Sequence, residues 1–140
     1  MTNVFFSDES MVTIRWNKHN KVRVCWGDEL PEKGFNQKEQ SIMVWGAISR
    51  RGTTELETVD EGKMNADYYC DFIEHSLVNT AQRLYGRKNK GKFRWRFQQD
   101  NAKVHTSFKA RNLIQHLEIR MVNHPPKSPD LNPIEYVWGY

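Results

Sequence analysis

The apolar pattern changes its period along the chain, and this change constrains the fold more than any other feature. Before residue 60 the apolar residues alternate or run together, as in β-strands, at residues 3–6, 11–16, 22–26, 41–49 and 55–59. From residue 65 they recur at three- and four-residue steps, as in a helix. Strands followed by alternating helices and strands predict an α/β fold with a mixed sheet.

The segment 65–86 predicts the clearest helix. Its apolar positions are Tyr69, Phe72, Ile73, Leu77, Ala81 and Leu84. Asn65 suits the N-cap, and Gly86 suits the stop. A strand at 93–99, a helix at 107–117, a strand at 119–122 and a last helix starting near Pro133 are expected next. We therefore expect about five strands, the first three antiparallel, with flanking helices.

Composition excludes several classes of protein. The 140 residues are 38% hydrophobic, which is enough for the core of one domain spanning residues 1–140. Two cysteines are too few for a disulfide framework, and the chain shows neither a secretory pattern nor an apolar run of about 18 residues. We expect a soluble protein with free thiols. Its net charge of +4 suits a polyanionic partner without requiring one.

Three carboxylates stand where side chains from different elements can converge. Asp8 follows the first expected strand, Asp100 follows the strand at 93–99, and Glu135 begins the last helix. Asp100 and Glu135 are separated by 34 residues, 101 to 134. Carboxylate oxygens suit Mg²⁺, and two such ions about 4 Å apart can activate an attacking oxygen and stabilise a leaving one.

Each carboxylate also has a simpler structural interpretation. Asp8 and Asp100 can be turn residues that follow strands. Glu135 can belong to a capping box, with Asn132 as the N-cap and Pro133 at the first helical position. The spacing alone does not decide between a metal site and these structural roles.

Four motifs carry a resemblance to a known family. VFFSDES, MVWGAIS, FQQDNAKVHTS and PPKSPDLNPIEYVWG, in this order, resemble the catalytic domain of mariner-type DDE transposases, in the branch whose third acid is Glu. The match runs from Asn3 to Gly139, and the 34-residue gap is typical of that branch. The resemblance implies an RNase H-like fold in which Asp8, Asp100 and Glu135 form the metal-binding triad.

The resemblance also implies a reaction and its partners. The cofactor would be Mg²⁺ or Mn²⁺, with two ions when substrate is bound. Metal-activated water would hydrolyse a phosphodiester at the transposon end, and the resulting 3′-hydroxyl would attack target DNA at a TA dinucleotide. The implied partners are DNA and, in the full-length protein, a second copy of the chain. In a eukaryotic host the implied location is the nucleus.

Supporting residues are expected around the triad. In the motif FQQDNAKVHTS, Asn101 and His105 can contact the scissile phosphate or orient a metal ligand, and His105 can equally be a helix-start residue bonded locally. Glu9 and Asp130 compete as ligands at lower rank. A continuing strand would turn Glu9 away from the first acid, and Asp130 lies in a Pro turn.

A basic run precedes the strand at 93–99. It comprises Arg87, Lys88, Lys90, Lys92, Arg94 and Arg96. These cations can follow a DNA backbone, or they can belong to an exposed loop with a charged strand edge. The sequence leaves this choice open.

Two departures from the family pattern leave other functions open. Measured against full-length relatives, the chain is expected to lack the N-terminal helix-turn-helix modules, and its last helix would have about eight residues, with Trp138 as the obvious anchor. A remnant that binds nucleic acid or a partner without cutting is therefore one alternative. An RNase H-type hydrolase with the same fold is another.

Overall fold

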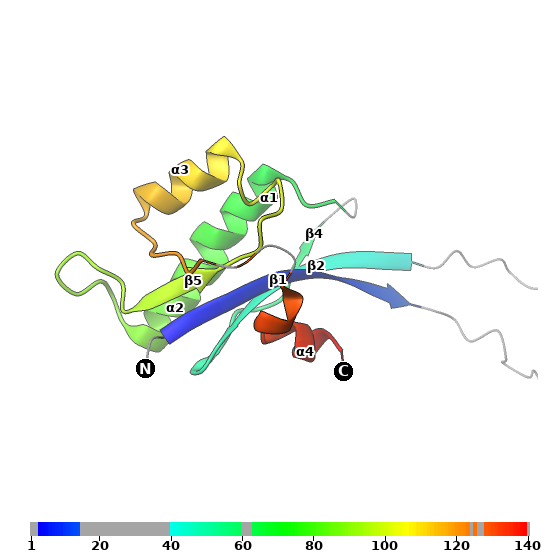
Figure 1. Ribbon diagram of the computed structural model, residues 1–140, viewed down its shortest axis with the longest axis horizontal. Helices are drawn as coiled ribbons and strands as arrows, with labels where there is room; N and C mark the ends of the chain where they lie inside the picture. Colours follow the sequence, from blue (N-terminus) through cyan, green and yellow to red (C-terminus); the bar gives the residue numbers. More distant parts are fainter. Residues whose placement is uncertain (1–2, 15–39, 60–62, 124, 126–127, 140) are drawn as a thin grey trace, which may run out of the picture.

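A five-stranded mixed sheet forms the centre of the computed structural model, which describes residues 3–14, 40–59, 63–123, 125 and 128–139 (Figure 1). The strands are β1 (Asn3–Ile14), β2 (Gln40–Ser49), β3 (Gly52–Thr53), β4 (Glu57–Val59) and β5 (Trp95–Gln98). Their order is β3-β2-β1-β5, and β4 pairs with β2 beside β3. The expected strand at 22–26 and Cys25 lie outside the described residues.

Strand β1 is the longest strand and organises the sheet. It pairs antiparallel with β2 from Phe6 opposite Ile48 to Ile14 opposite Gln40. It pairs parallel with β5 only up to Phe6 opposite Gln98. The strands expected at 3–6 and 11–16 are therefore one continuous strand as far as Ile14, because the ladder with β2 continues through the polar residues between them. Residues 15 and 16 lie outside the described residues.

The long helix expected at 65–86 is present in three consecutive parts. They are α1 (Ala66–Asp71), the π-helical turn η2 (Phe72–Leu77) and α2 (Val78–Tyr85). The side chain of Asn65 accepts a hydrogen bond from the Tyr68 N–H at 2.9 Å, and Gly86 ends the helix at a φ of 77°. Both local signals in the sequence are confirmed.

Three shorter helical segments follow β5. They are α3 (Phe108–His116), the 3₁₀ turn η3 (Pro129–Leu131) and α4 (Ile134–Trp138). Ser107 caps α3 by accepting from the Ala110 N–H at 3.2 Å. In Figure 1, α1, α2 and α3 lie on one side of the β1–β2 pair and α4 lies on the other.

Aromatic side chains fill the core between the sheet and the long helix. The Phe5 ring meets Tyr85 and Trp95 edge-on, with centroid separations of 5.6 and 5.4 Å. Trp45 stacks on Phe72 at 5.7 Å, and both Trp45 and Trp95 are fully buried. These tryptophans therefore pack in the core, and they stabilise the face of the sheet that the long helix covers.

Two expected strands differ from the structure. The apolar run of β2 is buried only from Val44 to Ala47, and Ile42 is exposed, because the far halves of β1 and β2 extend beyond the helices as a two-stranded ribbon (Figure 1). The strand expected at 119–122 is reduced to a single parallel bridge between Phe97 and Met121.

Candidate metal and active site

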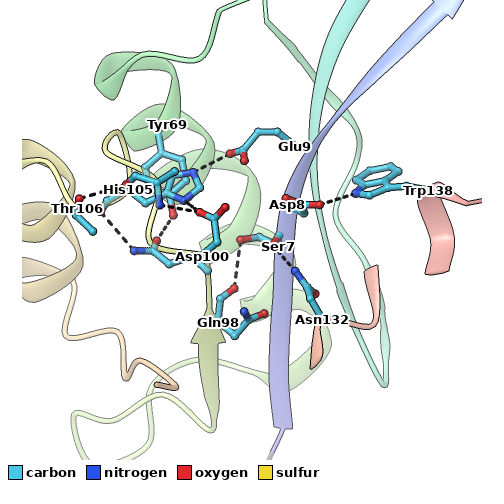
Figure 2. A network of polar contacts seen from close by, with 12 residues as sticks. Ser7, Asp8, Glu9, Tyr69, Gln98, Asp100, His105, Thr106, Asn132 and Trp138 are labelled. Carbon is cyan, nitrogen blue, oxygen red and sulfur yellow. Dashed lines mark hydrogen bonds and ion pairs between the residues drawn. The ribbon is translucent and has the colours of Figure 1, made fainter. Parts of the chain in front are cut away.

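Asp8 lies in the middle of β1, opposite Gly46 of β2. The expectation that Asp8 follows a strand is therefore wrong, and its interpretation as a turn residue does not apply. Successive side chains of a strand point to opposite faces. Accordingly, Asp8 reaches Trp138 of α4, whereas Glu9 reaches His105 on the other side of β1 (Figure 2). The expected divergence of Glu9 from Asp8 is confirmed.

Gly46 makes room for the group that holds Asp8. A Cβ at Gly46 would lie 3.1 Å from Cδ2 of Leu56 and 3.5 Å from Cη2 of Trp138. The Trp138 ring therefore packs over the β2 backbone, where its Nε1 donates to Oδ2 of Asp8 at 3.2 Å. This contact fixes one carboxylate oxygen of Asp8.

Asn132 attaches the start of α4 to the sheet. Its Nδ2 donates to the Ser7 carbonyl at 3.1 Å, and its Oδ1 accepts from the Ile134 N–H at 3.3 Å. Its own backbone N–H donates to the Pro129 carbonyl at 2.9 Å. In a capping box, the Glu135 side chain would accept a hydrogen bond from this N–H. Here the N–H is already bonded to Pro129, and the Glu135 side chain contacts Asp8 instead.

Asp8 and Glu135 form a close pair of carboxyl groups. Burial raises the pKa of Asp8 from 3.8 to about 7, and the neighbouring charge of Glu135 and a side-chain hydrogen bond with it add to the increase. Two carboxyl groups at such close range disfavour ionisation of both, and a cation between them would relieve this repulsion. The first and third expected acids are therefore brought together.

The second acid, Asp100, follows β5 and is held by His105. Nδ1 of His105 lies 2.6 Å from Oδ1 of Asp100, and the same oxygen accepts from the Ala102 N–H at 3.0 Å. The Nδ1 contact has the distance of an ion pair but lacks the direction of a good hydrogen bond. Asp100 begins a turn, as its structural interpretation proposed, and its side chain remains half exposed.

His105 is buried between two carboxylates. Only 1% of the residue is exposed, and Nε2 lies 2.8 Å from Oε1 of Glu9. Burial lowers its pKa, but the contacts with Asp100 and Glu9 outweigh this effect and raise the pKa to about 9. The alternative of a histidine bonded only locally is wrong, because Glu9 is 96 residues away.

The ring of Tyr69 supports His105 from the long helix. The two rings stack with centroids 4.2 Å apart and planes at 26°. The Tyr69 hydroxyl donates to Oε1 of Gln99, whose Nε2 donates to the His105 carbonyl at 3.3 Å. The sequence placed Tyr69 only in the apolar stripe of a helix, where its spacing gave no sign of this second role.

The three expected acids, Asp8, Asp100 and Glu135, do not form a single cluster in this structure. Within the described part of the chain, no three His, Cys, Asp or Glu side chains are close enough to enclose a metal ion. Asp8 pairs with Glu135, whereas Asp100 pairs with His105. Asn101 is exposed beside Asp100, and Asp130 is exposed in η3.

The six cations of the basic run are exposed, and four of them lie on or beside a tight turn before β5. Lys90 and Gly91 have φ values of 49° and 76°, and Asn89 and Lys92 form a bridge. Lys88 pairs with Glu118 at 2.9 Å. This loop precedes β5, whereas Asp100 follows it, so the loop and Asp100 lie at opposite ends of the strand (Figure 1).

Comparison with known sequences gives a clear match. The model of the family described as DDE superfamily endonuclease matches residues 3–140. The Tc3 transposase of Caenorhabditis elegans is 34% identical over 142 residues, which cover 99% of this chain and 40% of that protein. The Tcb1 transposase of Caenorhabditis briggsae is 37% identical over 98 residues, covering 70% of this chain and 33% of that protein. The chain thus spans well under half the length of these relatives.

Solved structures show the same fold. A pre-cleavage Mos1 transpososome matches with a TM-score of 0.71 at 24% identity, covering 95% of this chain and 39% of that one. The Mos1 transposase catalytic domain with raltegravir and Mg matches with a TM-score of 0.69 at 22% identity, covering 95% and 55%. The expected RNase H-like fold is confirmed. No helix in the described residues is long and apolar enough to cross a membrane.

Proposed function

The chain belongs to the DDE superfamily of endonucleases, and on this premise we propose that it is the catalytic domain of a cut-and-paste DNA transposase. Its reaction is metal-dependent hydrolysis of a phosphodiester at the transposon end, followed by strand transfer to target DNA at a TA dinucleotide. In a eukaryotic host the domain acts in the nucleus, as part of a longer protein that works as a homodimer.

The sheet register is the observation that carries this proposal. Phe6 of β1 lies opposite Gln98 of the parallel strand β5. Asp8 and Asp100 each follow two residues later, so they extend from neighbouring strands at the same level. Glu135 approaches Asp8 from α4. This arrangement of parallel neighbours and a helix held against one of them supports convergence of the three carboxylates on metal near one end of β5.

The donor set fits a hard divalent cation. Carboxylate oxygens are the ligands that Mg²⁺ and Mn²⁺ prefer. Without a cation, burial and Glu135 raise the pKa of Asp8 and favour its protonated form, and a divalent cation between the two groups would favour ionisation of both. Asp8 and Asp100 would hold the metal, as two ions when substrate is bound, and Glu135 would complete one of the two sites. When bound, such ions activate the attacking oxygen and stabilise the leaving oxygen of the phosphodiester.

The protein residues bind and orient the groups that react. Trp138 holds one oxygen of Asp8, and His105 holds one oxygen of Asp100, so both carboxylates have a restricted orientation. Asn101, which is exposed beside Asp100, contacts the scissile phosphate. Buried His105 has both ring nitrogens on carboxylates and orients a ligand instead of touching DNA.

The exposed basic run supports DNA as the partner. Arg87, Lys88, Lys90, Lys92, Arg94 and Arg96 follow the phosphate backbone of DNA at the end of β5 away from the carboxylates. The Mos1 structures include a paired-end complex with the left transposon end. For the present chain, we propose transposon-end DNA as the corresponding ligand.

Calorimetric titration with Mg²⁺ and Mn²⁺ tests this proposal most directly. We expect binding to the unmodified chain and its loss in Asp100→Asn, with Asp130→Asn as a matched control that retains binding. Absence of binding at millimolar metal would overturn the catalytic proposal and favour a remnant that binds nucleic acid without cutting. Cleavage of an RNA–DNA hybrid in preference to duplex DNA would instead indicate an RNase H-type hydrolase.

A further inference from the structure

The contact between Glu9 and His105 joins two distant parts of the chain inside the protein. Glu9 lies on β1 one residue after Asp8 and points to the opposite face (Figure 2). The side chains of Glu9 and His105 are 17% and 2% exposed, so their 2.8 Å contact is shielded from water. Shielding strengthens such a contact and makes the loss of one partner costly.

The imidazole of His105 has little freedom to turn. Tyr69 stacks on its face, and Gln99 ties the Tyr69 hydroxyl to the His105 carbonyl. With Glu9 on Nε2, the orientation of Nδ1 is determined, and Nδ1 lies 2.6 Å from Asp100. A change at Glu9 therefore alters the orientation of the His105 ring beside Asp100, and it does so without a direct contact between the two carboxylates.

We propose that Glu9 is a positioning residue that fixes the carboxylate of Asp100 through the buried ring of His105. This inference rests on the proposed function, in which Asp100 binds metal. The sequence offered Glu9 as a lower-ranked metal ligand, whereas this inference gives it an indirect role. The alternation of β1 supports this assignment, because Glu9 and Asp8 point to opposite faces.

Glu9→Ala, Glu9→Gln and Glu9→Ala combined with His105→Asn test the proposal. Glu57 is the matched control, since Glu9 and Glu57 both pair with Trp45 from its two neighbouring strands. The first readout is Mn²⁺ affinity measured by electron paramagnetic resonance. The second is the ¹³Cγ resonance of Asp100 and the ¹⁵N resonances of the His105 ring, recorded without metal.

We expect Glu9→Ala to weaken Mn²⁺ binding about 10- to 100-fold, as is typical for loss of a group that orients a ligand. Glu9→Gln keeps an acceptor for Nε2 and should restore most of this affinity, and Glu57→Ala should not change it. In the His105→Asn background, removal of Glu9 should have little further effect. A full further loss there would mean direct ligation and would overturn the proposal.

The metal-free spectra separate this inference from the proposed function. We expect Glu9→Ala to move the Asp100 and His105 resonances, and Glu9→Gln to move them less. An unchanged Asp100 resonance in folded Glu9→Ala would overturn the positioning role, whatever metal does. Absence of Mn²⁺ binding to the unmodified chain would instead overturn the proposed function on which the role depends.

Discussion

The indole of Trp138 donates its N–H to Asp8 across 130 positions of sequence, at a distance of 3.2 Å. The contact joins the last helix to the middle of the first strand. It also lies within one turn of Glu135, so the same short helix both restrains Asp8 and supplies its neighbouring carboxyl group. The geometry of two candidate ligands thus depends on how α4 is attached.

Trp138→Phe should weaken this attachment. Phenylalanine has no donor for Asp8 and lacks the Cη2 atom that approaches Gly46, so we expect a loss of at least about 1 kcal/mol in the free energy of unfolding and a lower Mg²⁺ affinity. Denaturant unfolding and calorimetry measure the two effects. Tyr136→Phe, on the exposed side of α4, is the control. Equal metal affinity in both variants would contradict a role for the indole N–H.

Asn132→Ala should release α4 from the sheet. The substitution removes the donor to Ser7 and the acceptor for Ile134, and it leaves buried backbone groups unpaired, which costs about 1–3 kcal/mol. Hydrogen exchange should accelerate at the amides of α4. Exposed Asn112 gives a control in Asn112→Ala, and unchanged protection of α4 in Asn132→Ala would contradict the attachment.

Asp8→Asn should stabilise the metal-free protein at neutral and alkaline pH. The folded-state pKa of Asp8 is raised from 3.8 to about 7, so its contribution to stability is present below pH 4 and is lost as pH rises through 7. Asn keeps an oxygen for Trp138 but cannot ionise beside Glu135. Melting curves in a chelator should diverge from the wild type between pH 4 and 7. A difference that does not vary with pH would refute this coupling.

Lys90→Glu should weaken DNA binding and its dependence on salt. Removing one cation from the phosphate backbone reduces the slope of log affinity against log salt by about one. Fluorescence anisotropy in a chelator measures binding without cleavage. Lys63→Glu makes the same change in net charge at an exposed position before α1 and should leave the slope unchanged. Identical slopes for both variants would mean that the turn does not contact DNA.

Local signals in the sequence predicted those parts of the fold that local interactions determine. Asn65 caps the long helix and Gly86 ends it because each acts on backbone groups within a few residues. The continuous course of β1 escaped prediction, since its middle is polar and is stabilised by β2, a strand distant in the sequence. The family resemblance supplied the fold as a whole, which the structure confirms.

The surroundings of the candidate acids were predicted less well, because they depend on distant contacts. Strand alternation correctly predicted that Glu9 and Asp8 point to opposite faces. The contact of Glu9 with His105, 96 residues away, is not indicated by any periodicity of the sequence. Tyr69 was similarly hidden within an apolar stripe. Asn132 was expected as the N-cap of the last helix, but the N-cap is Pro133. Asn132 instead accepts from the Ile134 N–H and donates to the Ser7 carbonyl, a bond that requires the placement of α4 on the sheet.

The attachment of α4 by Asn132 also bears on how the protein is made. Translation produces β1 before α4, so Asp8 emerges from the ribosome before Trp138 and Glu135. A nascent chain that ends before Asn132 can contain Asp8 and Asp100 but has nothing to hold against Asp8. The pairing of Asp8 with Glu135 therefore waits until α4 has been made, and premature termination upstream of α4 prevents it.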